Sequence, residues 1–61
     1  MRTRRVVGDV NIGDMIVWAG LVVEVVDEKP AVGGGRYLIV ATTKGDRQLH
    51  YARGEQVEVV T

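Results

Sequence analysis

Apolar residues along this chain either alternate with polar ones or run in short β-branched blocks. No window shows the i, i+3, i+4, i+7 spacing of an amphipathic helix. We therefore predict strands and no helix of ordinary length. The expected strands lie near residues 3–7, 14–19, 21–28, 36–43, 47–52 and 57–60. The connections between them are short, which indicates antiparallel neighbours.

Glycines mark the predicted turns. Gly13-Asp14 opens the second strand, Ala19-Gly20 closes it, and Lys44-Gly45-Asp46 is the clearest hairpin signal. The segment 29–35 is the one long connection. It contains Pro30 and three consecutive glycines, so we expect a mobile loop there.

Strand alternation assigns residues to two faces. One face should form the interior, together with two residues of the turn before the second strand: Val10, Ile12, Ile16, Trp18, Leu21, Val23, Val25, Leu38, Val40, Thr42, Leu49, Tyr51, Val57 and Val59. The opposite face is also apolar, at Met15, Val17, Val22 and Val26. Either tight curling buries both faces in places, or a partner covers the second face. We favour a partner and take these four residues as its candidate surface. A further copy of the chain is the simplest partner.

Length and composition support one small domain that lacks covalent or metal reinforcement. At 61 residues the chain is near the lower limit for a self-sufficient core. It has no cysteine, which excludes disulfides and thiolate metal sites, and its single histidine argues against structural zinc. We expect residues 1–8 to form a basic N-terminal arm or first edge strand, and residues 9–61 to form the domain.

The net charge is zero, but the charges are sorted along the chain. Residues 1–8 carry arginines and no acid, residues 9–28 carry acids and no base, and residues 29–53 are basic apart from Asp46. Opposite charges on adjacent strands would pair across the sheet. Alternatively, one of these blocks forms a functional charged patch.

The candidates for catalysis are few. The chain has no cysteine or serine, and no threonine has the context of a nucleophile. Asp27 and Glu28 are adjacent, so in a strand they point to opposite faces and cannot form an acid–base pair. His50 stands alone and fits an exposed side chain better than a general base. Residues 33–36 lack the ending of a phosphate-binding loop. We expect no enzymatic activity, no cofactor and no metal.

Nucleic-acid binding is the alternative function. Small β-barrels bind single strands through basic grooves and exposed aromatic rings. The candidate residues are Arg2, Arg4, Arg5, Arg36, Tyr37, Lys44, Arg47, His50 and Arg53. Against this interpretation, the zero net charge is unfavourable for a non-specific binder, and Tyr51 and Trp18 are needed in the core.

The order of these features resembles SH3-like and KOW-like small β-barrels, especially short ones from actinobacteria and their phages. The resemblance rests on Val10-x-Ile12-Gly13-Asp14 before a strand, on the glycine turns and on the terminal Val57-x-Val59-Val60. It implies an all-β fold, a five- to six-stranded antiparallel SH3-like barrel in which residues 53–56 form a short 3-10 turn before the last strand. The proline-binding groove of that fold is not carried over, because this chain has few aromatic residues.

These observations predict a non-enzymatic protein-interaction module that self-associates. The resemblance implies a phage-encoded protein directed at a host or phage protein. The alternative is a small barrel that binds single-stranded DNA or RNA. No segment has the roughly 20 apolar residues of a membrane span, and the first residues do not form a signal peptide. We therefore expect a cytoplasmic protein that does not bind membranes.

Overall fold

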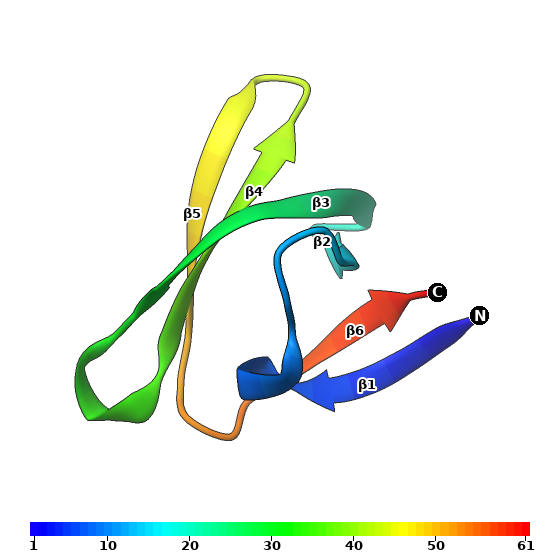
Figure 1. Ribbon diagram of the computed structural model, residues 1–61. Helices are drawn as coiled ribbons and strands as arrows, with labels where there is room; N and C mark the ends of the chain where they lie inside the picture. Colours follow the sequence, from blue (N-terminus) through cyan, green and yellow to red (C-terminus); the bar gives the residue numbers. More distant parts are fainter.

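Six antiparallel strands form one strongly bent sheet in the computed structural model, which describes residues 1–61 (Figure 1). The strands are β1 (Arg2–Val6), β2 (Met15–Trp18), β3 (Leu21–Pro30), β4 (Arg36–Thr42), β5 (Gly45–Tyr51) and β6 (Gln56–Val60). Their order in the sheet is β1-β6-β2-β3-β4-β5. The predicted all-β antiparallel fold is confirmed, and the strand limits lie close to those predicted from alternation.

Strand β3 joins the two halves of the sheet. Its first residues pair with β2, and its residues from Glu24 onward pair with β4. Between Val25 and Asp27 the register shifts at a β-bulge, which increases the local bend. Figure 1 shows β3 curving between the long β4–β5 hairpin on one side and β2, β6 and β1 on the other.

The sheet is open. Strands β1 and β5 are its two edges, and no ladder joins them, so the predicted barrel is not closed by hydrogen bonds. Residues 2–6 form the edge strand β1 and are not a free arm. Both edges carry charged side chains, which discourage pairing with other chains.

The core lies inside the bend. Nine buried residues form it: Val7, Val10, Ile16, Val23, Val25, Leu38, Val40, Val57 and Val59. Trp18, Leu49 and Tyr51 are partly buried and pack against this cluster. Eight of the nine were predicted from the sequence, and the exception is Val7, which belongs to a 3-10 segment after β1.

Two residues expected in the interior lie outside it. Ile12 is 59% exposed and Leu21 is 56% exposed. Ile12 sits in the connection before β2, where strand alternation does not apply. Leu21 points to the interior side of β3, but the β3–β4 ladder begins only at Glu24, so β4 does not pair with β3 at that point.

The connections differ from expectation at two places. A short 3-10 segment occurs at Val7–Asp9, and the one assigned to Val32–Gly34 is interrupted by Gly33, whose φ of 81° is left-handed. Residues 53–56 instead contain a hydrogen-bonded turn in which the Glu55 amide donates to the Ala52 carbonyl (3.0 Å). Gly54 has a φ of 79°, a left-handed value that a 3-10 helix does not accommodate. The predicted 3-10 turn before the last strand is therefore wrong. The long 29–35 loop is also shorter than expected, because β3 continues through Pro30.

Candidate interaction surfaces

The outer side of β6, β2 and the start of β3 carries clustered apolar side chains. Val17 pairs with Val22 across β2 and β3, and Met15 lies two residues before Val17 on the same side. Val60 of β6 is the cross-strand partner of Met15. None of the four belongs to the core cluster, and Met15 and Val22 are 37% and 46% exposed. We call Met15, Val17, Val22 and Val60 the apolar face.

Opposite charges border the apolar face. The pairing register places Arg2 opposite Val60, Val60 opposite Met15, and Met15 opposite Glu24. These four residues therefore form one row across β1, β6, β2 and β3, with a cation at one end and an anion at the other. Arg2 Nη1 also lies 3.9 Å from Glu58 Oε2, and both side chains are well exposed.

Val26 does not join this face. It is the extra residue of the β3 bulge, has no cross-strand partner, and is 37% exposed. Glu24 lies between Val22 and Val26 along the outer side of β3. The predicted partner surface is thus only partly continuous. Met15, Val17 and Val22 lie together, whereas Glu24 separates Val26 from them. Val60 completes the cluster, and its place there follows from the return of the last strand beside β2.

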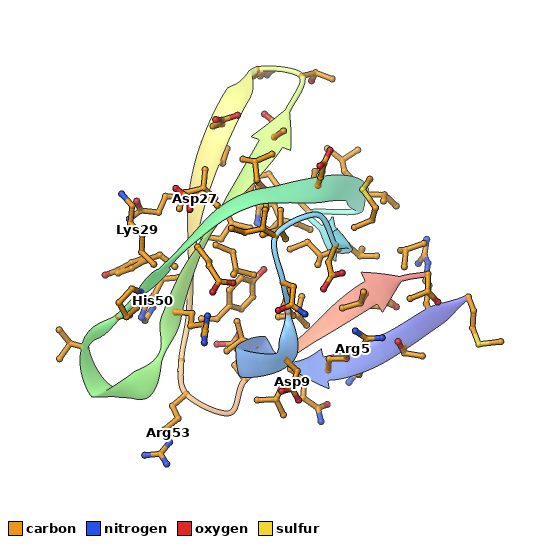
Figure 2. The ribbon with its side chains drawn as sticks, viewed as in Figure 1. Arg5, Asp9, Asp27, Lys29, His50 and Arg53 are labelled. Atoms are coloured by element: carbon orange, nitrogen blue, oxygen red, sulfur yellow. The ribbon has the colours of Figure 1, made fainter.

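A second surface lies on the outer side of the β3–β4–β5 half. Tyr37 pairs with His50 on β5 and with Lys29 on β3. The Tyr37 and His50 rings are tilted by 47°, with centroids 5.1 Å apart. Lys29 and His50 lie on the same side of the molecule in Figure 2. Lys29 is not among the residues predicted from the sequence, because its place beside Tyr37 depends on the register of the β3–β4 hairpin.

The other predicted nucleic-acid residues are dispersed. Arg2 and Arg4 lie on the outer side of β1, whereas Arg5 lies on the opposite side of that strand, where it pairs with Val57. Lys44 occupies the β4–β5 turn, and Arg47 is an exposed residue of the edge strand β5. Figure 2 shows Arg5 and Arg53 well away from His50. These residues do not form one continuous basic groove.

Arg36 forms a salt bridge with Glu28. Its Nη1 donates to Glu28 Oε1 at 2.5 Å, and about one third of each side chain is exposed. Both residues line a groove of about 270 Å³ at the loop end of the β3–β4 hairpin, whose other walls are Lys29, Pro30, Ala31, Gly34 and Gly35. The Ala31 amide donates to the Gly35 carbonyl (2.9 Å) and closes the loop. Because Glu28 neutralises Arg36, the net positive charge of this groove comes from Lys29 alone.

A smaller groove lies where β3 separates from β4. Its volume is about 160 Å³, and it is lined by Leu21, Val22, Val23, Ala41, Thr42 and Thr43. The β3–β4 ladder starts at the pair Glu24 and Ala41, so the preceding residues of β3 diverge from β4 there. This divergence opens the groove, and its lining is mainly apolar.

Tyr51 is the ionisable group with a perturbed environment. Partial burial against the core raises the pKa of its phenol above the usual value, and the nearby Glu55 carboxylate raises it further. No group of three or more His, Cys, Asp or Glu side chains is arranged to hold a metal ion.

Comparisons with known proteins assign no family. The chain matches no protein-family model, no curated protein and no solved structure. The structure also contains no helix that is long and apolar enough to cross a membrane.

Proposed function

We propose that this protein is a non-enzymatic interaction module that associates with itself through the apolar face. The observation that supports this proposal is the cluster of Met15, Val17, Val22 and Val60 outside the core. An exposed apolar cluster with a charged border is typical of an interaction site. A partner that covered the cluster would remove apolar surface from water, which is the main favourable contribution to most protein association.

The small core gives a physical reason for association. Nine buried apolar residues, without disulfides, form the interior of a chain of 61 residues. Domains of this size bury only about 60% of their unfolded surface and are marginally stable. Association of folded copies stabilises the fold by mass action, since the unfolded chain has no such face to offer.

Analytical ultracentrifugation of the wild-type protein from 10 to about 500 μM tests the proposal. We expect the weight-average mass to rise with concentration and to reach that of an oligomer. Val22→Asp should keep the protein monomeric, because it puts a charge within a desolvated contact. Leu21→Asp is the matched control, since Leu21 is the neighbouring residue, is equally apolar and is 56% exposed, but does not belong to the apolar face. A wild-type monomer at all concentrations would refute self-association.

We also propose that the fold is a variant of the SH3-like small barrels. Five strands lie in the order β6-β2-β3-β4-β5, so the last strand of the chain, β6, lies beside β2. Strand β1 then pairs with the free edge of β6. A bent and open sheet suits a partly open barrel of this kind. A phage origin, a host-directed role and a cytoplasmic location stay predictions from the sequence.

Nucleic-acid binding is a second candidate, supported by the row of Lys29, Tyr37 and His50. Two rings and an ammonium group on one exposed side of a sheet suit base stacking and a phosphate contact. Fluorescence polarisation with labelled single-stranded DNA and RNA at 20 mM and 150 mM salt tests this. Tyr37→Ala should abolish binding, whereas Arg5→Ala, on the other side of the sheet, should retain most of it. Absence of binding at 20 mM salt would eliminate this function.

A further inference from the structure

We propose that two copies of this chain pack apolar face against apolar face, with Arg2 of each copy opposite Glu24 of the other. The two-fold axis runs parallel to the strands, between β6 and β2. This inference rests on the proposed self-association and adds its geometry. The partner that covers the apolar face is a second copy of the chain. The charge pattern across β1, β6, β2 and β3 favours this partner, because the pattern is complementary to itself after a two-fold rotation.

The row Arg2, Val60, Met15 and Glu24 is suited to contact its own rotated image. A two-fold axis between β6 and β2 places β1 over β3 of the second copy and β6 over β2 of the second copy. Val60 then faces Met15, and the cation faces the anion. Because the interface is isologous, each contact occurs twice, so one row supplies two ion pairs around an apolar centre.

The same charges disfavour the other simple arrangement. A two-fold axis perpendicular to the strands would place β1 over β1 of the second copy. Arg2 and Arg4 lie on the outer side of β1, so they would then face arginines of the other copy. Like charges brought together in an interface oppose association. The axis parallel to the strands avoids this clash.

The local geometry permits the contact. Two sheets that pack face to face keep their strands within about 30° of each other, which keeps the central row of one copy close to that of the other. Four strands about 4.8 Å apart span roughly 19 Å, so the contact lies at the small end of specific interfaces and the dimer should be weak. Arg2 is free to reach a second copy, because its 3.9 Å approach to Glu58 is loose and exposed.

Charge reversal tests the pairing. Arg2→Glu and Glu24→Arg, each alone, place like charges at both ion pairs, and each should raise the dimer dissociation constant about tenfold or more. The double variant restores opposite charges and should recover most of the affinity. Mixing the two single variants is the sharper test, because a heterodimer of Arg2→Glu with Glu24→Arg has opposite charges at both pairs. The mixture should therefore dimerise more tightly than either component alone.

Controls separate this geometry from general attraction between proteins of opposite net charge. Arg5→Glu and Asp9→Arg change the net charge by the same amounts, but Arg5 lies on the other side of β1 and Asp9 lies in the 3-10 segment. Each should dimerise like the wild type, and mixing them should add no affinity. Thermal unfolding checks that every variant is folded.

Sedimentation velocity at 150 mM salt distinguishes the possible outcomes. If the wild type dimerises and the Arg2→Glu and Glu24→Arg variants dimerise with the same dissociation constant, this geometry is wrong and self-association through the apolar face still stands. If the control mixture associates as strongly as the test mixture, the specific Arg2–Glu24 contact is also overturned. A monomeric wild type at all concentrations would overturn both the geometry and the proposed function.

Discussion

Gly35 lies directly against the backbone of Tyr51. A Cβ atom at Gly35 would come within 2.5 Å of the Tyr51 carbonyl oxygen, although the φ of Gly35, −75°, is one that any residue adopts. The requirement for glycine is therefore steric and not conformational. The contact joins the loop after β3 to the end of β5, at the ladder pair of Arg36 with Tyr51.

Gly35→Ala should destabilise the fold. Relieving a contact with backbone atoms requires β4 or β5 to shift, and overpacking of this kind costs about 1–3 kcal/mol. In a domain of this size each kcal/mol lowers the Tm by about 4–8 °C. Gly8→Ala is the control, since nothing lies within 4 Å of a Cβ there and its φ is not left-handed. Thermal unfolding followed by circular dichroism should separate the two variants, and equal Tm values would contradict the close approach.

Val7 and Ile12 test the assignment of the core. Val7 is 1% exposed and Ile12 is 59% exposed. Val7→Ala removes two buried methyl groups and leaves a small cavity, so it should lower the free energy of unfolding by about 2 kcal/mol. Ile12→Ala should change it by no more than about 0.5 kcal/mol. Urea titrations followed by Trp18 fluorescence measure both, and the opposite ranking would show that Ile12 belongs to the core.

Val7 and Leu21 show how far the sequence determines the structure. Alternation located the strands and seven of the nine core residues, because period two follows from strand geometry, and Val10 was assigned to the core from the turn before β2. It did not identify Val7, which lies in a 3-10 segment, or show that Leu21 begins β3 before the β4 ladder starts. A strand's pattern says which side a residue faces, but not whether another strand covers it.

The candidate surface was predictable to a similar extent. The outward apolar residues Met15, Val17 and Val22 follow from the pattern of single strands. The position of Arg2 beside Val60 does not, because these residues are distant in sequence and meet only through the return of β6 between β1 and β2. Long-range register of this kind depends on the topology of the whole sheet.

The β2–β3 hairpin offers a site for stabilisation. Trp18 pairs with Leu21, and the two residues between them, Ala19 and Gly20, both have positive φ values, 52° and 77°. This is the type I′ geometry, in which Asn-Gly is preferred and a left-handed alanine costs about 1 kcal/mol. Ala19→Asn should therefore raise the free energy of unfolding by about 0.5–1 kcal/mol in urea titrations.

The β4–β5 turn provides the control for that substitution. Thr43 and Lys44 form its centre, and neither has a positive φ. Thr43→Asn should therefore bring no comparable gain. A similar increase in both variants would mean that the effect does not come from left-handed backbone at residue 19.

Tyr51 should make stability decline in alkaline solution. Its pKa is raised in the folded protein, first by burial and second by Glu55, so the folded state holds the phenolic proton more tightly than the unfolded state does. The stabilisation is complete below the unfolded pKa of about 10 and is lost as the pH rises through the higher folded pKa. Tyr51→Phe lacks this ionisation, so its urea midpoint should fall less than that of the wild type between pH 9 and 11.5. Tyr37→Phe removes the other tyrosine and should keep the wild-type decline, whereas parallel curves for wild type and Tyr51→Phe would show that burial of the Tyr51 ring does not oppose its ionisation.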